Sequence, residues 1–449
     1  MNLRMSSVLP ALFDSLHPTL LPPIRPTLSS TQLTIETGYP SGSVTRDVFT
    51  LSDYSSINVV GLGKASLSSL MPFADELVRS PRPPSLRLLC VSKAATSSPA
   101  HVAALESADC EIVYGDHPTP TESSVYAAEE VIKLCSEPSS LNLVFLSGGT
   151  SSLCCLPSVS LDLYKKITGA LVSSSHPIQS INSLRSVLDN FKSGGLASEI
   201  LKADDGSALK TYLISDVIDD DVRYIGSGPT CYQERDVELA KDVWRSLKPE
   251  LKGEVGVDEV DKILDRLKEE EKKGVPEVPS GYSHPTIISR NSDAVTLAAK
   301  ILSESTGMKV FPDLEPFDGA ASDVIHEIID DAVKRGPGIY VKGGESTVEF
   351  DVESGGKGGR NMEMCLIGAV KICEMGLEDK VSLACYGTDG NDGPTDAAGA
   401  MWWGGGCEGG VEKLEAHDSY TFWAQRGRGE LIFTPGGTNL ADLVVAVVN

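Results

Sequence analysis

The sequence has few basic residues, no long apolar segment and no Cys-x-x-Cys motif. Its 449 residues include 39 Lys and Arg against 63 Asp and Glu, which gives a formal net charge of −24. That field repels polyanions, so nucleic acids and anionic membrane surfaces are not expected as partners. No stretch reaches the length of about 18 apolar residues that a membrane-spanning helix requires. The ten cysteines show no Cys-x-x-Cys spacing, which favours core thiols in a reducing, cytoplasmic compartment.

Several catalytic signatures are also missing. The sequence contains no G-x-x-x-x-G-K-[ST], no protein-kinase motif set, no H-E-x-x-H and no G-x-S-x-G. These absences count against P-loop enzymes, protein kinases, zinc proteases and α/β-hydrolases. Only seven histidines are present, and His117, in the segment Asp-His-Pro-Thr-Pro, follows an expected strand. We therefore predict His117 as the histidine that contacts a ligand.

Short apolar runs alternate with helix-like stretches, and this order is typical of an α/β fold with a mostly parallel sheet. The first set of expected strands covers residues 57–60, 86–91, 111–114, 143–146 and 211–214. A second set covers residues 286–289, 309–311, 339–341, 382–386 and 431–433. A segment rich in proline and glycine at residues 274–283 predicts a linker between the two sets. We therefore expect one domain at residues 1–282 and a second at residues 283–449.

Two segments outside the expected strands have helical patterns. Near the N-terminus apolar residues recur every fourth position, at Val8, Leu12, Leu16 and Leu20. This spacing predicts a helix that caps a domain of the mature protein rather than a cleaved targeting segment. Residues 234–273 are rich in charge and end in Glu-Glu-Glu-Lys-Lys, which predicts a solvated surface helix.

Two glycine-rich loops directly follow strands of the first set and offer groups that bind anions. Glycines allow close approach of the backbone to an anion, and hydroxyls and freed N–H groups donate hydrogen bonds to phosphate. The first loop contains Gly61, Gly63 and Lys64, and the second contains Ser147, Gly148, Gly149, Thr150 and Ser151. Each loop alone is also consistent with an ordinary strand–helix turn. Two such loops after two strands of one sheet favour a shared phosphate site.

Acidic residues follow two further strands. Asp216 comes directly after the strand at residues 211–214, and Asp389 and Asp392 lie in the loop Tyr-Gly-Thr-Asp-Gly-Asn-Asp-Gly-Pro-Thr-Asp. Carboxylate oxygens suit Mg²⁺, and a carboxylate can also accept the proton of a substrate hydroxyl. These three aspartates are therefore the candidate metal ligands.

A cationic group is expected in the C-terminal half as well. The segment Gly-Gly-Lys-Gly-Gly-Arg-Asn opens a helix and presents Arg360, whose planar guanidinium can bind an anion at two points. Glu345 follows another strand, directly after two glycines. Together with the loops and carboxylates, these groups suit phosphoryl transfer, which depends on positioning and charge neutralisation.

The ordered motifs GLGKAS, DHPTP, LSGGTSSL, INSLRSVL, ISDVIDDD with GSGPT, KGGESTV, GGRNMEM and GTDGNDGPTDAAGA resemble the glycerate 2-kinase family. The C-terminal part of that family is called the MOFRL domain. The resemblance extends from about residue 8 to the C-terminus and keeps the order of the motifs. After Asn182 the family usually reads V-R-K-H-L-S, whereas this sequence keeps the Arg as Arg185 and lacks the Lys-His pair.

The resemblance implies ATP-dependent phosphorylation of D-glycerate at the 2-hydroxyl, with Mg²⁺ as a cofactor. It also implies a larger Rossmann-like N-terminal domain, a smaller MOFRL domain and an active site in the cleft between them. Lys64 and Arg360 match cationic active-site residues of the family, and Asp216 and Asp389 match acidic ones. The loop at residues 148–152 is expected to hold the nucleotide phosphates. The expected substrate contacts are Arg185, His117, Glu345 and Asn361.

Two alternatives remain at this point. Members of the family have also been named hydroxypyruvate reductase, which would require a nicotinamide site. The loop after residue 60 has a serine at the third glycine position of the dinucleotide motif, and no clear acidic partner stands about 20 residues further on. The second alternative is a nucleotide-binding relative without catalysis. The retained Lys64, Asp216, Arg360 and Asp389 argue against it.

Overall fold

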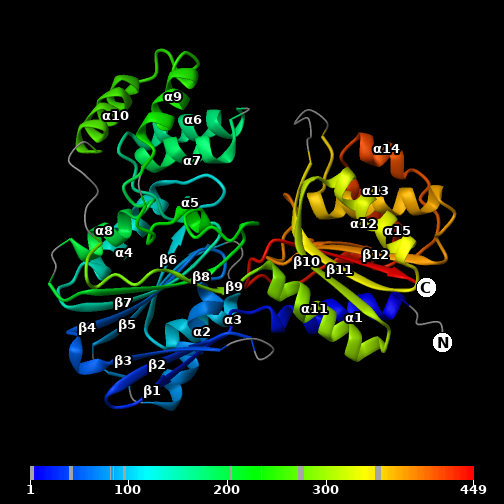
Figure 1. Ribbon diagram of the computed structural model, residues 1–449, viewed down its shortest axis with the longest axis horizontal. Helices are drawn as coiled ribbons and strands as arrows, with labels where there is room; N and C mark the ends of the chain where they lie inside the picture. The colour runs from blue at the N-terminus through cyan, green and yellow to red at the C-terminus, as the bar shows by residue number, and fades with distance from the viewer. Residues whose placement is uncertain are drawn as a thin grey trace. The chain divides into compact units, whose positions relative to one another are not determined.

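In the computed structural model the chain forms two compact units (Figure 1). The structure describes residues 5–39, 44–80, 82–83, 85–94, 98–174, 176–202, 205–233, 235–271, 278–348 and 355–449. The parallel-sheet unit consists of Ile24–Ile214 and Asp221–Ile288. The mixed-sheet unit consists of Met1–Pro23, Ser215–Asp220 and Ser289–Asn449.

The parallel-sheet unit is built on a six-stranded sheet with the order β6-β5-β4-β7-β8-β9. Its strands are β4 (Ser56–Leu62), β5 (Leu86–Lys93), β6 (Cys110–Gly115), β7 (Ser140–Ser147), β8 (Ala208–Ile214) and β9 (Thr286–Ser289). β4 and β7 are buried along their whole lengths, because helices cover both faces of the sheet. Each strand of the first predicted set, and the strand predicted at residues 286–289, is confirmed.

Helices flank this sheet on both faces (Figure 1). α2 (Ser66–Arg79) and α3 (Pro99–Ser107) lie on one face, and α4 (Glu122–Cys135) and α8 (Gly195–Leu201) lie on the other. The short α5 (Thr150–Leu153) follows β7 directly. An antiparallel meander of β1 (Ile24–Leu28), β2 (Gln32–Thr37) and β3 (Thr45–Thr50) packs through β1 against α2. The sequence patterns did not predict this meander.

A helical layer with its own apolar core extends the unit. It contains α6 (Leu161–Val172), α7 (Ile178–Val187), α9 (Val237–Leu247) and α10 (Val257–Glu271). The charged stretch predicted as one solvated helix is two helices, and the chain between them contains Gly253 and Gly256 at positive φ. Neither helix is fully solvated, because Trp244 on α9 and Leu264 on α10 face this core. Part of the predicted linker, residues 274–277, lies outside the described residues.

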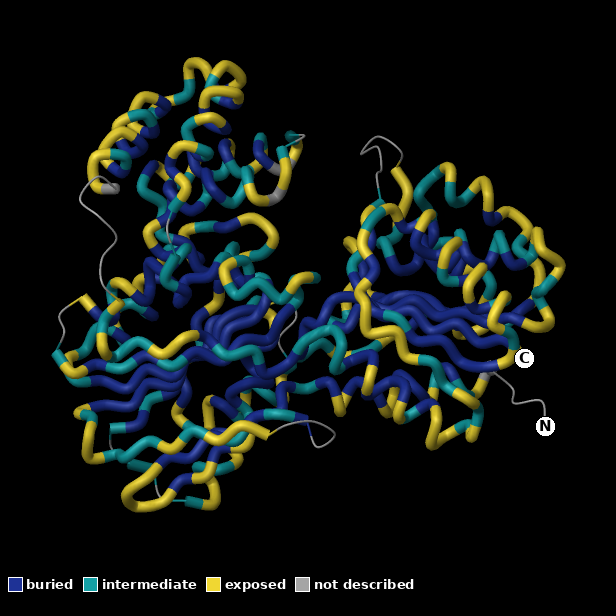
Figure 2. Tube along the Cα trace, viewed as in Figure 1, coloured by how far each residue is buried: buried dark blue, intermediate teal, exposed yellow. Residues whose placement is uncertain are grey.

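The mixed-sheet unit is built on a second six-stranded sheet with the order β10-β11-β15-β12-β13-β14. Its strands are β10 (Val310–Ala320), β11 (Gly338–Thr347), β12 (Val381–Gly387), β13 (Gly399–Trp402), β14 (Leu431–Ile432) and β15 (Asp442–Val448). β10 and β11 pair in parallel, and the other pairs are antiparallel. The fully buried β15 lies between β11 and β12. In each unit the central strands of its sheet are buried (Figure 2), whereas the edge strand β10 is mostly exposed.

Helices also cover both faces of the mixed sheet (Figure 1). α12 (Ala321–Arg335), α13 (Arg360–Glu374), α14 (Gly410–Glu415) and α15 (Ser419–Arg426) lie on one face, and α1 (Met5–Thr19) and α11 (Asn291–Thr306) lie on the other. α1 confirms the predicted N-terminal helix and buries Leu12 and Leu16. Its Phe13 ring lies 4.9 Å from the ring centroid of Tyr386 at the end of β12.

The two units divide the chain differently from the expected boundary after residue 282. The break falls between residues 288 and 289, and the mixed-sheet unit also includes the N-terminal helix and residues 215–220. The physical reason is packing, since α1 lies against α11 and Ser215 donates its backbone N–H to the Ser289 carbonyl at 2.8 Å. Among the described helices, none combines the length and the apolar character that crossing a membrane demands.

Two buried asparagines connect the central strands of the parallel sheet to α4. Asn58 on β4 donates to the Asn142 side-chain oxygen at 2.9 Å and to the Leu134 carbonyl at 3.1 Å. Asn142 on β7 donates to the Cys135 carbonyl at 3.2 Å. These bonds satisfy carbonyl groups at the C-terminal end of α4 that have no partner within the helix.

We expect Asn58→Leu to lower the free energy of unfolding by about 1–3 kcal/mol, because it leaves Asn142 and the Leu134 carbonyl without their buried donor. Urea unfolding of Asn58→Leu, Asn142→Leu and the double variant measures this effect. The double variant should lose less stability than the sum of the single variants. Strict additivity would contradict a direct interaction between the two side chains.

Candidate active site

The two predicted glycine loops meet at one edge of the parallel sheet. β4 and β7 are neighbours whose Leu62 and Leu146 lie opposite each other, so both loops begin at the same level. The Lys64 backbone N–H donates to the Gly148 carbonyl at 2.9 Å, and the Ala65 N–H donates to Ser147 Oγ at 3.0 Å. This edge is formed by the carboxyl ends of the strands, where ligands bind in open α/β sheets.

Glycine is required where these loops touch. Gly63 has a φ of +101°, and a Cβ atom there would lie 2.5 Å from both the carbonyl oxygen and Oγ of Ser147. A Cβ atom built at Gly149 would lie 3.1 Å from Lys64 Cγ and 3.6 Å from His117 Cδ2. The loops therefore bring Lys64, His117 and Gly149 together, although these residues are far apart in the sequence.

The hydroxyls of the second loop have different partners. Thr150 is fully buried, and its hydroxyl donates to the Ser147 carbonyl at 2.8 Å. This hydrogen bond stabilises the turn between β7 and α5. Ser152 Oγ donates to the Pro118 carbonyl at 2.7 Å. Ser151 Oγ lies 2.7 Å from Ser227 Oγ, which belongs to the loop after β8. Ser151 thus connects the glycine loop to the wall of a neighbouring cavity.

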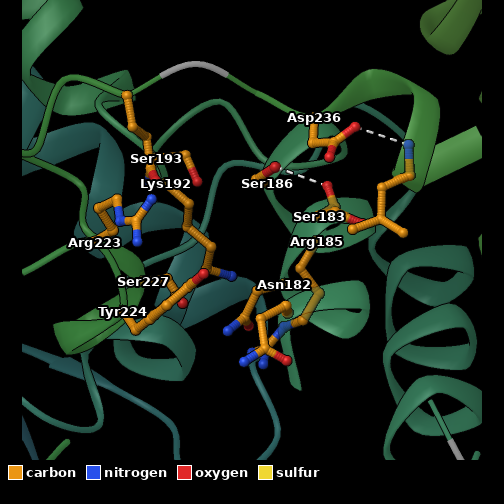
Figure 3. Close-up of a pocket in the computed structure, with 13 residues that line it drawn as sticks. Asn182, Ser183, Arg185, Ser186, Lys192, Ser193, Arg223, Tyr224, Ser227 and Asp236 are labelled. Atoms are coloured by element: carbon orange, nitrogen blue, oxygen red, sulfur yellow. Dashed lines mark hydrogen bonds between the residues drawn. The ribbon is translucent and has the colours of Figure 1, made fainter. Parts of the chain in front are cut away.

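That cavity has a volume of about 220 Å³ and lies entirely within the parallel-sheet unit (Figure 3). It is lined by Gln179, Asn182, Ser183, Arg185, Ser186, Lys192, Ser193, Arg223, Tyr224, Ser227, Gln233, Asp236 and Leu239. Residues of α7 form one side in Figure 3, and Lys192, Ser193 and residues 223–227 form the other. The predicted substrate residue Arg185 therefore lies at a cavity, and its Nε is buried without a hydrogen-bond partner among the described residues.

A buried ion pair that the sequence patterns did not reveal lies in the wall of this cavity. Lys192 Nζ is 2.7 Å from Asp189 Oδ2, and both side chains are almost fully buried. Tyr164 donates to the same carboxylate at 2.9 Å and accepts a hydrogen bond from Lys192. Burial opposes the charge on Lys192, but the adjacent Asp189 carboxylate outweighs it, so the pKa of Lys192 lies above its ordinary value. The sequence feature that could have indicated this ion pair is the spacing of Asp189 and Lys192, three residues apart in a segment with few other charges.

Two predicted carboxylates flank one loop of the mixed-sheet unit. Asp216 Oδ2 accepts a hydrogen bond from Asn439 Nδ2 at 2.7 Å. Asp389 follows β12 and accepts from the backbone of Asn391 at 3.0 Å, and a Cβ atom at Gly436 would lie 3.1 Å from the Asp389 carbonyl. The loop at residues 434–439 therefore contacts both aspartates.

The third predicted metal ligand, Asp392, lies in a different environment from Asp216 and Asp389. Asp392 is buried, and its two oxygens accept backbone hydrogen bonds from Asn361 at 3.0 Å and Met362 at 2.7 Å. These are the first N–H groups of α13, so the carboxylate caps this helix. Across the described residues, no group of three or more His, Cys, Asp or Glu side chains is arranged to hold a metal ion.

Arg360 lies between two carboxylates at the start of α13. Its Nε is 2.7 Å from Asp442 Oδ2, and its Nη1 is 2.5 Å from Glu345 Oε1. Asn361 donates to Asp442 Oδ1 at 2.9 Å and is itself buried. The predicted substrate residues Glu345 and Asn361 are therefore placed around the guanidinium and its partner. The sequence patterns did not identify Asp442 as a site residue. The feature that could have indicated it is a single acidic residue directly before the apolar run Leu-Val-Val-Ala-Val-Val.

Comparison with known proteins assigns the chain to a family. A model described as a domain of unknown function, DUF4147, matches residues 24–260, and the MOFRL family model matches residues 338–442. The protein named glycerate 2-kinase of Pyrococcus horikoshii is 31% identical over 366 residues, which cover 75% of this chain and 78% of that protein. The chain belongs to the glycerate 2-kinase family.

Other members and a solved structure agree with this assignment. The crystal structure of glycerate kinase from Thermotoga maritima matches with a TM-score of 0.68 and 26% identity, covering 89% of this chain and 92% of that one. An Agrobacterium vitis protein named putative hydroxypyruvate reductase is 29% identical, over 76% of this chain and 88% of its own length. In this glycerate 2-kinase family member, the MOFRL match falls within the mixed-sheet unit.

The cap on α13 makes stability depend on pH. Burial raises the pKa of Asp392 to about 7, far above the ordinary value of 3.8. Between these two values the folded protein binds the proton more tightly than the unfolded chain does, so stability falls as the pH rises through this window. Burial also raises the pKa of Asp442 to about 6, which acts in the same direction.

We expect Asp392→Asn to weaken this dependence, because the asparagine stays neutral. Between pH 5 and pH 8 the unmodified protein should lose about 2–3 kcal/mol more unfolding free energy than the variant. Urea unfolding followed by tryptophan fluorescence at both pH values measures the difference. The control is Asp396→Asn, an exposed aspartate whose pKa is lowered by Tyr420 and which therefore titrates below this range. Parallel pH profiles for the unmodified protein and Asp392→Asn would refute the assignment.

Proposed function

We propose that this protein transfers a phosphoryl group from ATP, with Mg²⁺, to the 2-hydroxyl of D-glycerate. The product would be 2-phosphoglycerate. Membership of the glycerate 2-kinase family supports this proposal. The observation that carries it is the contact between the two glycine loops, which gathers Lys64, Gly149 and His117 at the carboxyl edge of the parallel sheet.

The parallel-sheet unit would bind the nucleotide phosphates. Backbone N–H groups of the glycine loop after β7 would donate to phosphate oxygens, and Lys64 of the loop after β4 adds a positive charge beside this loop. Phosphoryl transfer depends mainly on positioning the reactants and neutralising charge on the transferred group. A rigid pair of loops with an adjacent lysine provides both.

The mixed-sheet unit would supply carboxylates for Mg²⁺. Asp216 and Asp389 offer hard oxygen ligands, and Asn439 orients the Asp216 carboxylate through its hydrogen bond. Mg²⁺ is usually held by one or two carboxylates together with substrate phosphates, so two aspartates are sufficient. Bound there, Mg²⁺ would neutralise charge on the phosphates. Either aspartate can also orient the attacking hydroxyl by accepting its proton.

Arg360 would provide a fixed cation from the same unit. Asp442 and Glu345 hold its guanidinium on two sides and thereby determine its orientation. Its side chain remains 36% exposed, which leaves part of the guanidinium accessible to an anionic ligand. In this proposal Arg360 neutralises the transferred phosphoryl group or the glycerate carboxylate.

Hydroxypyruvate reduction is supported by the name of one relative but not by the residues at the strand ends. Enzymes that bind NAD place an acidic residue near the end of the second strand of the Rossmann unit to hold the ribose. Here the corresponding strand, β5, ends in Ser92 and Lys93. We also propose a cytoplasmic location, because all ten cysteines are free thiols and most are buried.

A coupled assay tests the activity and its position together. We expect purified protein with ATP, Mg²⁺ and D-glycerate to yield phosphoenolpyruvate when enolase is added without phosphoglycerate mutase. Enolase accepts only the 2-phosphate, so the signal reports phosphorylation of the 2-hydroxyl. Release of ADP without phosphoenolpyruvate would reject the 2-hydroxyl as the acceptor. Oxidation of NADH with hydroxypyruvate would support the reductase instead.

The role of Arg360 is tested by Arg360→Lys. A lysine has one point charge and cannot contact Asp442 and Glu345 while presenting a planar group to an anion. We expect kcat to fall about 10²- to 10³-fold, the usual cost of losing one charged transition-state contact. The matched control is Arg335→Lys, an exposed arginine of the same unit that pairs with Asp331. Near-normal turnover in a folded Arg360→Lys variant would contradict the proposed role.

A further inference from the structure

We propose that the 220 Å³ cavity of the parallel-sheet unit is the acceptor site, in which Arg185 binds the carboxylate of a small 2-hydroxy acid. This inference rests on the proposed kinase activity and adds to it the part of the chain that recognises the acceptor. It is argued below from the size of the cavity, its charge and its connection to the glycine loops.

The size of the cavity selects a small ligand. Cavities that hold drug-sized molecules are about 300–1,000 Å³. A volume of about 220 Å³ is therefore too small for a nucleotide and suits a molecule with few heavy atoms. The lining is rich in hydroxyl and amide groups, including Asn182, Ser193 and Ser227, which can bond to the hydroxyls of such a molecule (Figure 3).

The charge of the cavity selects an acid. Of the three cations in its lining, Lys192 is paired with Asp189, and Arg223 is paired with Asp221. Arg185 has no carboxylate partner among the described residues, and its Nε is buried without a hydrogen bond. A partly buried guanidinium in this state is satisfied by a carboxylate, which it can bind through two parallel hydrogen bonds.

Ser227 connects the cavity wall to the glycine loop. This serine lines the cavity, and its Oγ lies 2.7 Å from Ser151 Oγ on the loop after β7. An acid held by Arg185 would therefore have its hydroxyl groups close to the loop proposed for the nucleotide phosphates. This arrangement lies within one unit of the protein.

The backbone around Ser227 is held in an unusual conformation. Ser193 and Ser227 have φ values of +51° and +65°, a region that residues with a side chain rarely adopt. Ser193 donates to the Ser227 carbonyl at 3.0 Å, and Gly194 donates to the Gly228 carbonyl at 2.8 Å. Strained backbone of this kind persists where surrounding contacts enforce it, and it is concentrated at ligand sites. The two segments joined by these hydrogen bonds, at Ser193 and at Ser227, form the wall of the cavity opposite α7.

Arg185→Gln tests the inference in the full-length protein. We expect the KM for D-glycerate to rise about 10- to 100-fold, the range for losing a charge-assisted hydrogen bond, while the KM for ATP stays within about twofold. Arg185→Lys should show a smaller rise, because it keeps the charge but not the two-point contact. The control is Arg245→Gln, an exposed arginine on α9 that pairs with Asp242. An unchanged KM for D-glycerate in active Arg185→Gln would overturn the proposal.

Calorimetry without nucleotide separates this inference from the proposed activity. D-glycerate should bind the unmodified protein, bind Arg185→Gln more weakly, and be bound in preference to glycerol, which lacks the carboxylate. Binding with these properties in a protein that releases no ADP from ATP and D-glycerate would reject the kinase activity and retain the acceptor site. Equal binding of D-glycerate by the unmodified protein and Arg185→Gln, or no binding by either, would overturn the site.

Discussion

Parallel pairing of β4 with β7 is the interaction on which the candidate site depends. Because Leu62 and Leu146 are paired, two loops separated by more than 80 residues leave the sheet side by side. Their backbone bonds, the close approach at Gly63 and the neighbouring Lys64 all follow from that pairing. The buried asparagines on the same two strands connect this pairing to α4, so both strands below the site are also held by side-chain hydrogen bonds.

Although the chain as a whole is strongly acidic, positively charged side chains occupy defined positions in both units. Each unit holds one of the cations described above beside a buried carboxylate, Lys192 beside Asp189 in the parallel-sheet unit and Arg360 beside Asp442 in the mixed-sheet unit. Such pairs fix where a positive charge stands, because a cation that moves away leaves a buried carboxylate uncompensated. Arg185 differs in having no carboxylate partner among the described residues.

The predictability of each element follows from its pattern of burial. Strands such as β4 and β7 are buried on both faces, so they appear in the sequence as continuous apolar runs. The meander β1–β3 has exposed and polar positions along its strands, and it left no comparable signal. The glycine loops were found because they directly follow predicted strands. The sequence patterns did not identify Asp442 and Lys192 as site residues, because their ion pairs form with partners that only the folded chain brings close.

The chain passes between the two units four times, after residues 23, 214, 220 and 288. Neither unit is therefore encoded by one continuous stretch of the gene. A fragment that begins after residue 288 lacks α1, whose Phe13 packs on Tyr386, and it lacks Asp216 with its bond to Asn439. Recombination that exchanges only the C-terminal half would separate these partners, so the two halves are expected to be inherited and to diverge together.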